Sequence, residues 1–198
     1  MSKLKSATKK SKLQPRKRFI MKYLYRSLFV LGIICYVFGI YFIWERNNPN
    51  RLAFKNYSGN IKIVKVVNPP VRIVIKDLNI DLPIYPAKIE NGQWETTTLG
   101  ASYLVSSPVP GQTGNSIIYA HDWVSLFGPL LDARQGEKVE IYYKDNSKKV
   151  FLIQKTLIVQ YNQPGILEQT NDTRITLYTC TGFLDSERMV AVSEYRMN

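Results

Sequence analysis

Three side chains of this sequence could together carry out nucleophilic chemistry: a cysteine, a histidine and an arginine. Cys180 is one of only two cysteines, and the other, Cys35, lies in a long apolar run. His121 is the only histidine. A thiolate attacks carbonyl carbons, an imidazole can protonate a leaving amine, and an arginine such as Arg188 can favour the thiolate or hydrogen-bond an oxyanion. We therefore predict that Cys180 is a nucleophile.

The cysteine closes the segment RITLYTC, residues 174–180. Ile175 and Leu177 alternate with polar or amphipathic residues, which is typical of a half-buried strand. If these two side chains point into a core, the thiol of Cys180 points to the opposite face, toward a surface or groove. The alternative is that Cys180 is a buried small hydrophobe, the commonest role of a free cysteine.

Position links the histidine and the arginine to the cysteine. His121 ends the apolar run 117–120 as Cys180 ends its own strand, so a barrel rim would bring both side chains together. The alternative for His121 is a strand-end histidine with a local hydrogen bond. Residues 181–187 form a seven-residue loop. If the flanking strands pair directly, Arg188 stands opposite Cys180, with Cβ atoms about 4.5–5.5 Å apart.

Other residue types near these three support weaker interpretations. Arg174 and Arg196 are competing cations, but neither has the pairing argument. Asp122 follows His121 and either orients the imidazole or is a solvated loop carboxylate. One histidine and one cysteine outside the apolar run are too few soft ligands for a structural zinc. No carboxylate cluster indicates a calcium site, so we expect no metal and no cofactor.

The N-terminal part of the sequence predicts a membrane anchor. Residues 24–44 are almost continuously apolar, and as a helix they would reach roughly 30 Å, the thickness of the hydrocarbon core of a bilayer. Ten of the 27 basic residues precede this run or lie at its start, whereas the first acidic residue is Glu45. An excess of Lys and Arg on one side places that side in the cytoplasm. We predict a cytoplasmic tail, 1–23, and an extracellular remainder.

Two alternatives to the anchor are weaker. A cleaved signal peptide also begins basic and continues apolar, but this run is longer than usual and Trp44 is followed by no small-x-small cleavage site. The basic tail could be a nucleic-acid arm, yet the adjacent span already explains its charge. Outside the tail, 17 basic residues nearly balance 15 acidic ones. We therefore expect a membrane and no nucleic acid as partners.

The rest of the chain has the pattern of a small all-β domain. Residues 45–68 are polar and broken by Asn, Pro and Gly, and we interpret them as an extracellular stalk. Residues 69–198 carry seven or eight short apolar strands with turn residues between them, which predicts an all-β barrel or sandwich. The clearest strands are 71–75, 80–85, 117–120, 139–143, 148–161, 174–180 and 188–195.

At this point the sequence resembles a known family. TLYTC at 176–180 resembles the TLxTC signature of the sortases, membrane-anchored cysteine transpeptidases of mainly Gram-positive bacteria. IDLPIY at 80–85, PGQTGNSIIYAH at 110–121 and FGPLLDARQGEKVEI at 127–141 are similar to sortase segments in the family's order. The resemblance implies a closed β-barrel of about eight strands with short helices. Because no second long apolar run follows, the chain resembles the sortases that have a single N-terminal anchor.

The resemblance also implies the reaction and the roles of the residues. Cys180 would attack the backbone carbonyl of an LPxTG-like sorting signal at the C-terminus of a surface protein, and His121 would protonate the departing amine. The thioester would then pass to an amine such as that of a cell-wall precursor peptide. Arg188 matches the family's arginine, at a shorter distance along the chain than in many sortases, and the backbone at Thr179 would stabilise the substrate. No cofactor is implied.

Two other functions stay open at this level. A cysteine peptidase would form the same acyl-enzyme and resolve it with water instead of an amine. A non-catalytic module would only bind the tails of surface proteins or cell-wall peptides.

Overall fold

The computed structural model describes residues 14–46, 49–55, 57 and 67–196. Most of the predicted basic tail and residues 58–66 of the predicted stalk lie outside this part of the chain. The chain divides into two units, which meet between Asn48 and Pro49 and are described separately.

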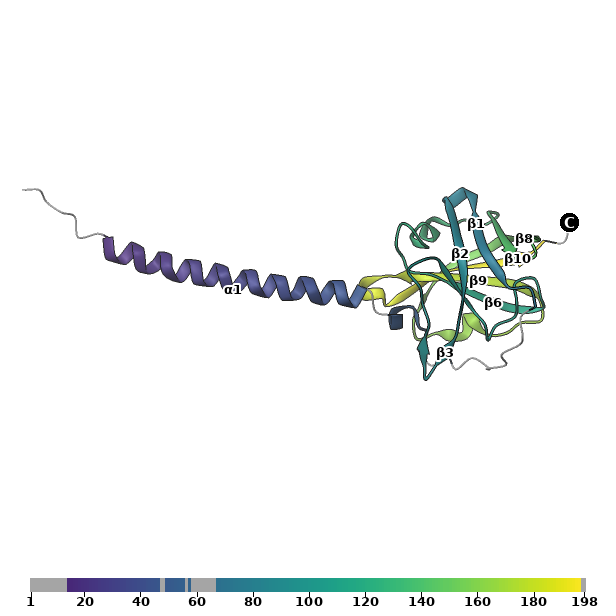
Figure 1. The fold of residues 1–198 in the computed structure, drawn as a ribbon, viewed down its shortest axis with the longest axis horizontal. Coiled ribbons are helices and arrows are strands. Elements are labelled where there is room, and N and C mark those ends of the chain that lie inside the picture. Colours follow the sequence, from purple (N-terminus) through teal and green to yellow (C-terminus); the bar gives the residue numbers. More distant parts are fainter. Residues whose placement is uncertain (1–13, 47–48, 56, 58–66, 197–198) are drawn as a thin grey trace, which may run out of the picture. The chain divides into compact units, whose positions relative to one another are not determined.

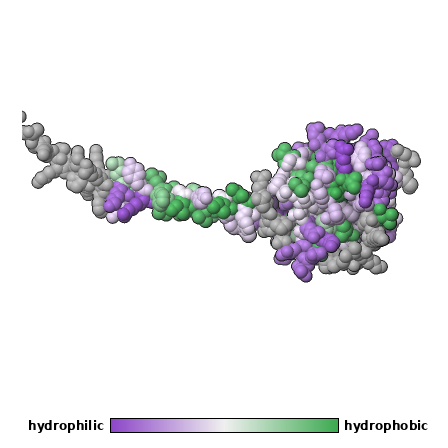
Figure 2. Space-filling model, viewed as in Figure 1, coloured by the Kyte–Doolittle hydropathy of each residue, from purple (hydrophilic) through white to green (hydrophobic). Residues whose placement is uncertain are grey.

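The first unit is a single helix, α1 (Gln14–Arg46). Its stretch Met21–Glu45 is long and apolar enough to cross a membrane, and it contains the predicted span 24–44. Large hydrophobic side chains are exposed throughout this stretch, and Figure 2 shows hydrophobic residues along much of its visible face. A helix that is apolar on all sides, with none of them packed against protein, is typical of a membrane span. No other helix among the described residues meets this test.

The second unit is a closed barrel of eight strands (Figure 1), as predicted. Six of its neighbouring pairs are antiparallel, whereas β2 with β5 and β6 with β9 are parallel. The pairing of β1 with β7 closes the barrel. In barrel order the strands are β1 (Pro70–Ile75), β2 (Ile80–Ala87), β5 (Ala101–Leu104), β6 (Gly114–Tyr119), β9 (Thr173–Thr181), β10 (Glu187–Tyr195), β8 (Lys148–Gln160) and β7 (Lys138–Tyr143).

Short elements connect these strands. A two-stranded sheet pairs β3 (Ile89–Glu90) with β4 (Gln93–Trp94). Five short 3-10 helices also lie between the described strands or just before them. The 3-10 helices are η1 (Pro49–Leu52), η2 (Lys76–Leu78), η3 (Gly128–Asp132), η4 (Pro164–Leu167) and η5 (Phe183–Asp185).

Two separate hydrophobic clusters lie on the two faces of the barrel wall. The inner cluster fills the barrel and contains buried residues of every barrel strand, among them Ile118, Ile175, Leu177, Met189 and Ala191. The outer cluster takes the opposite faces of β6, β9 and β10; its buried residues are Leu52, Phe54, Ala87, Trp94, Leu104, Ile117, Tyr119, Leu167, Tyr178, Cys180, Val190 and Val192.

Part of the segment interpreted as a stalk is packed on this outer cluster. Leu52 and Phe54 are 0% and 2% exposed, and the Phe54 ring meets the ring of Tyr178 edge-on at 5.1 Å. The backbone N–H of Lys55 donates to the carbonyl of Tyr161 at 2.9 Å. We call residues 49–55 the strap. The strap is anchored by two apolar side chains, Leu52 at the end of η1 and Phe54 just after it.

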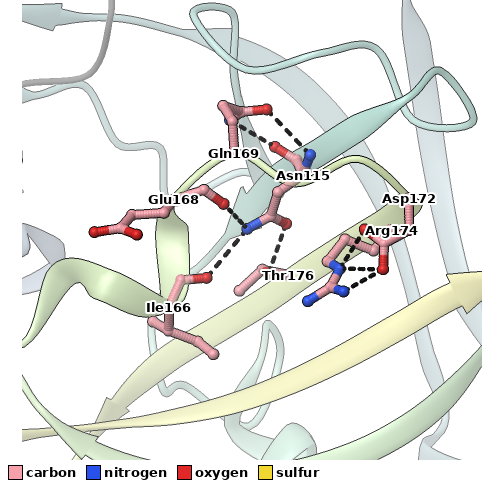
Figure 3. A network of polar contacts seen from close by, with 7 residues as sticks. All are labelled: Asn115, Ile166, Glu168, Gln169, Asp172, Arg174 and Thr176. Atoms are coloured by element: carbon pink, nitrogen blue, oxygen red, sulfur yellow. Dashed lines mark hydrogen bonds and ion pairs between the residues drawn. The ribbon is translucent and has the colours of Figure 1, made fainter.

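A polar network anchors the other border of the outer cluster (Figure 3). The Asn115 amide on β6 donates to the carbonyls of Ile166 and Glu168 at 3.1 and 3.2 Å, and accepts from the Thr176 hydroxyl at 2.7 Å. The backbone of Asn115 exchanges two hydrogen bonds with the Gln169 amide. These contacts hold the connection between β8 and β9 against the barrel, and with it Leu167 of the outer cluster.

Candidate functional site

The hairpin of β9 and β10 brings the predicted arginine and cysteine together. Arg188 is paired with Cys180, as the loop length predicted. The loop between them contains Gly182, Leu184 and Asp185, all with positive φ, at 78°, 53° and 57°. Positive φ is costly for residues with a Cβ, and such strain concentrates at functional sites. The hairpin therefore has an unusual connection directly after the cysteine.

The parallel pairing of β6 with β9 brings the histidine to the same place. The last pair in this register is Tyr119 with Tyr178. Beyond it, the Thr179 hydroxyl donates to the Ala120 carbonyl at 2.8 Å. Continuing the register by two residues sets His121 level with Cys180. Side chains alternate along strands, so both fall on the side of Tyr119 and Tyr178, toward the outer cluster. Cys180, His121 and Arg188 thus meet at one end of β6, β9 and β10.

The predicted face of Cys180 is confirmed, but its predicted exposure is wrong. Ile175 and Leu177 belong to the inner cluster and Cys180 to the outer one, as the alternation predicted. The thiol does not open to a surface, however: Cys180 is 2% exposed, Arg188 2% and His121 5%. The reason is the strap, which covers this face.

A single backbone carbonyl of the strap contacts both the thiol and the guanidinium. The Cys180 thiol donates to the carbonyl oxygen of Arg51 at 3.2 Å. Nη2 of Arg188 donates to the same oxygen and also to the Ala53 carbonyl at 2.9 Å. Both are backbone carbonyls, the same groups that a bound peptide would present. The strap therefore occupies the space where a carbonyl would meet Cys180 and Arg188.

The guanidinium of Arg188 is held in one orientation. Nη1 donates to the carbonyls of Asp185 and Glu187 at 2.7 and 2.8 Å, and the Phe54 ring lies 5.7 Å from Cζ. Nε is buried without a hydrogen-bond partner among the described residues. The guanidinium is planar, so fixing Nη1 with two backbone carbonyls of its own hairpin also fixes the direction of the N–H groups on Nη2 and Nε. These N–H groups are the ones that can bind a ligand.

An ion pair links the strap to the hairpin loop. Nε of Arg51 lies 2.6 Å from a carboxylate oxygen of Asp185, and both side chains are largely buried. Asp185 is also the residue whose carbonyl holds Nη1 of Arg188. The same loop residue therefore contacts both the strap and the arginine beside the thiol.

Thr179, the fourth predicted site residue, is fully buried. Its hydroxyl donates to the Ala120 carbonyl, and this hydrogen bond links the residue before His121 to the residue before Cys180. Asp122 is exposed beside His121. Neither side chain is hydrogen-bonded to the Cys180 thiol among the described residues, and the Thr179 hydroxyl bonds backbone instead.

Burial dominates the ionisation of the cysteine. It raises the pKa of the Cys180 thiol to about 12, although the charge of Arg188 acts in the opposite direction. Removing a thiolate from water costs more here than the neighbouring guanidinium returns. Cys180 is therefore a neutral thiol at neutral pH while the strap is in place.

Burial also dominates the ionisation of the histidine. It lowers the pKa of His121, the Asp122 carboxylate raises it, and the Arg51 guanidinium lowers it further. Burial therefore favours the neutral imidazole of His121, as it favours the neutral thiol of Cys180. A neutral imidazole is the form that can accept a proton.

Sequence reasoning missed the residues of the strap. The Arg51 carbonyl accepts a hydrogen bond from the Cys180 thiol, and the Arg51 guanidinium lowers the pKa of His121. Arg51 nevertheless lies 129 residues before Cys180 in the sequence. The available signal was weak: Leu52 and Phe54 are two alternate apolar residues in a polar segment. Among the described residues, no group of three or more His, Cys, Asp or Glu could hold a metal ion.

Comparisons with known proteins agree on one family. The family model described as "Sortase domain" matches residues 73–196. The chain is 30% identical over 99 residues to a curated sortase A of Listeria monocytogenes serovar 1/2a, a match that spans 48% of this chain and 44% of that relative, less than half its length.

Solved structures show the same fold. A lid mutant of sortase A from Corynebacterium diphtheriae superposes with a TM-score of 0.57 at 23% identity, covering 68% of this chain and 74% of that one. Sortase A of Listeria monocytogenes gives a TM-score of 0.53 at 25% identity, covering 64% and 86% of the two chains. The strap, residues 49–55, lies outside the part that the family model matches.

Proposed function

Because the chain belongs to the sortase family, we propose that it is a cysteine transpeptidase that forms a thioester through Cys180. The substrate class is an LPxTG-like sorting signal at the C-terminus of a surface protein. The acceptor is an amine such as that of a cell-wall precursor peptide. The observation that carries the proposal is the Arg51 carbonyl, which accepts hydrogen bonds from both the thiol and Arg188.

In the first half-reaction the Cys180 sulfur bonds to the scissile carbonyl carbon. The thiol proton passes to His121 and from there to the departing amine as the C–N bond breaks. In the second half-reaction an acceptor amine attacks the thioester carbonyl and gives up a proton to His121. The C–S bond breaks, and the thiolate regains its proton from the imidazolium. The protein therefore ends in its starting protonation state.

Arg188 would stabilise the negative oxygen of the tetrahedral intermediates. Nη2 already binds two peptide carbonyls of the strap, and Nε has no partner among the described residues. Directed donors at a developing oxyanion are commonly the largest single contribution to such catalysis. A charged donor that is already oriented needs no reorganisation at the moment of reaction.

The strap must move before a substrate can reach the thiol. Its Arg51 carbonyl and the carbonyl of a substrate cannot occupy the same space beside Cys180. The similar structure from C. diphtheriae is described as a lid mutant, and we propose that the strap is the lid of this chain. Its departure would also return water to Cys180 and lower the pKa of the thiol, since burial is the main cause of its elevation.

The proposed location follows from α1. The apolar stretch Met21–Glu45 would anchor the chain in the cell membrane, with the Lys- and Arg-rich N-terminus in the cytoplasm. The catalytic domain, proposed to begin at residue 69 after the stalk, would then face the cell wall. Its partners would be sorting signals and acceptor amines, and not nucleic acid.

The test uses the full chain in detergent micelles, an LPxTG-like peptide and a glycine peptide as amine. Joined product supports the transpeptidase, free acid alone supports a cysteine peptidase, and no turnover supports a binding module. Trapping of an acyl-enzyme by mass spectrometry should be abolished in C180A and unaffected in C35A. An acyl-enzyme on C180A would contradict the assignment.

The lysine variant of Arg188 separates charge from geometry. Lys keeps the positive charge but has no planar fork. We expect R188K to lose about 10²–10³-fold in kcat, the usual loss for an oxyanion donor. Nearly unchanged turnover would mean that Arg188 acts only as a charge near the thiol.

A further inference from the structure

The loop that follows His121 is a compact turn that folds back on the histidine. The His121 carbonyl accepts a hydrogen bond from the backbone N–H of Phe127 at 3.0 Å. The Trp123 carbonyl accepts two more, from the N–H groups of Leu126 and Gly128, at 2.8 and 2.9 Å. The backbone of Trp123 is thereby fixed relative to that of His121.

Close packing makes this turn rigid. A Cβ on Gly128 would lie 2.7 Å from the carbonyl oxygens of Asp122 and Trp123, so no larger residue fits there without shifting the turn. Phe127 is fully buried in the inner cluster and holds the turn to the barrel. The turn therefore fixes the backbone position from which the side chain of Trp123 extends.

The indole of Trp123 lies against the imidazole of His121. The ring centroids are 5.2 Å apart and the ring planes differ by 22°, a stacked arrangement. Trp123 is partly buried and also packs against the inner cluster. The indole is therefore supported by the barrel, and the imidazole cannot rotate its plane without leaving the stack.

We propose that Trp123 is a positioning residue for His121, which fixes the plane of the imidazole and stabilises its protonated form during the reaction. The proposal rests on the proposed function, in which His121 carries a proton between the thiol and the amines. The face of an indole attracts a cation that lies over it, and the attraction is larger when water is excluded.

The indole differs from the charged groups around His121. Asp122 in the same loop favours the imidazolium, and Arg51 on the strap disfavours it. Cys180 on β9 is level with His121, and Arg188 on β10 is paired with Cys180. Of these two residues, Arg188 is the positively charged one. Burial opposes the imidazolium most. An uncharged aromatic face offsets part of this burial cost without adding a charge that would disturb the thiol.

The experiment measures the pKa of His121 directly. His121 is the only histidine, so the full chain in detergent micelles, labelled with ¹³C-histidine, gives a single imidazole signal to titrate. W123F keeps an aromatic face, whereas W123L keeps apolar cover without one. Comparing these two variants holds water exclusion similar and isolates the ring. V124A, at a neighbouring position that is 90% exposed, is the matched control.

We expect the protonation equilibrium of His121 to be about three- to tenfold less favourable in W123L than in W123F, a pKa lower by about 0.5 to 1. W123F should also recover most of the acylation rate that W123L loses. The acid limb of the pH–rate profile, where His121 becomes protonated and can no longer accept the thiol proton, should shift to lower pH in W123L alone. V124A should match the wild type in all three.

Equal pKa values in the Phe and Leu variants, or a higher value with Leu, would overturn the inference. This outcome is independent of the proposed function, because the titration needs no substrate. Failure of the proposed function would instead appear as an unmodified Cys180 in the wild type, whatever the titration shows. If the pKa values differ as expected but acylation rates do not, Trp123 does not act in the reaction and the proposal also fails.

Discussion

The two hydrophobic clusters differ in how they are closed. The inner cluster is enclosed by the eight strands themselves, so no single segment can leave without opening the barrel. The outer cluster is closed by the strap on one side and by the connection between β8 and β9 on the other. The residues proposed for catalysis belong to this second face. The barrel thus supplies the rigidity, and in the proposed function the strap is the cover that moves to give access to the thiol.

This difference shows how one strand can serve stability and chemistry together. Alternate residues of β9 enter the two clusters: Leu177 is buried in the barrel, and Cys180 is buried under the strap. Both are almost fully inaccessible. We therefore expect the burial of Leu177 to be permanent and the burial of Cys180 to depend on the strap, and four variants test this difference.

The largest effect on stability is expected from L177A. The side chain is fully buried inside the barrel, and its removal leaves a cavity that the closed sheet cannot fill. We expect a loss of about 2–5 kcal/mol in the free energy of unfolding. Chemical denaturation of the full chain in detergent, followed by tryptophan fluorescence, measures it. I158A on β8, 61% exposed, is the control and should change stability by about 0.5 kcal/mol or less.

The double variant L52A/F54A should act on reactivity more than on stability. Without its two anchors the strap leaves the outer cluster, water reaches Cys180, and the pKa of the thiol falls from about 12. Each unit of decrease raises the thiolate fraction about tenfold at neutral pH. Iodoacetamide labelling in a C35A background should become at least about tenfold faster at pH 7.5.

K55A provides the control for this variant, since Lys55 lies on the same strap with an exposed side chain. It should leave the labelling rate unchanged. If L52A/F54A destabilises the barrel as much as L177A while labelling stays slow, the strap is part of the permanent core and the contrast between the clusters disappears.

The variant N115L tests the fixed border of the outer cluster. Leu has a similar size but no amide, so the carbonyls of Ile166 and Glu168 and the hydroxyl of Thr176 lose their buried partner. We expect a cost of about 1–3 kcal/mol and faster hydrogen exchange between residues 163 and 169. E168A removes an exposed side chain while the carbonyl bound by Asn115 stays, so exchange there should remain slow.

The smallest effect is expected from R51Q. The Arg51 charge lowers the pKa of His121, so its removal raises that pKa, and any loosening of the strap raises it further by returning water. The same single-histidine NMR titration measures the change, with K55Q as a control for charge on the strap. A lower pKa in R51Q would show that the strap does not place its charge near the imidazole.

Much of the fold and of the site was predictable because the signals are local. Alternating apolar residues set the strands and the face of Cys180, and the length of loop 181–187 set Arg188 opposite to it. The burial of that face was not predictable from β9 alone. Thr176, Tyr178 and Cys180 look like residues of a solvated or groove-lining face. They become internal only because the strap and the connection between β8 and β9 pack on this face.

The sequence by itself determined the long apolar helix, the all-β class, the strand parity of Cys180 and its pairing with Arg188, since each depends on residues close together in the chain. The tertiary structure alone decided that Arg51, 129 residues before Cys180, places its carbonyl between thiol and guanidinium. It also decided the ionisation of the site, because the pKa of Cys180 and of His121 depends on burial. Burial arises from contacts between distant segments, and no periodicity within one segment records them.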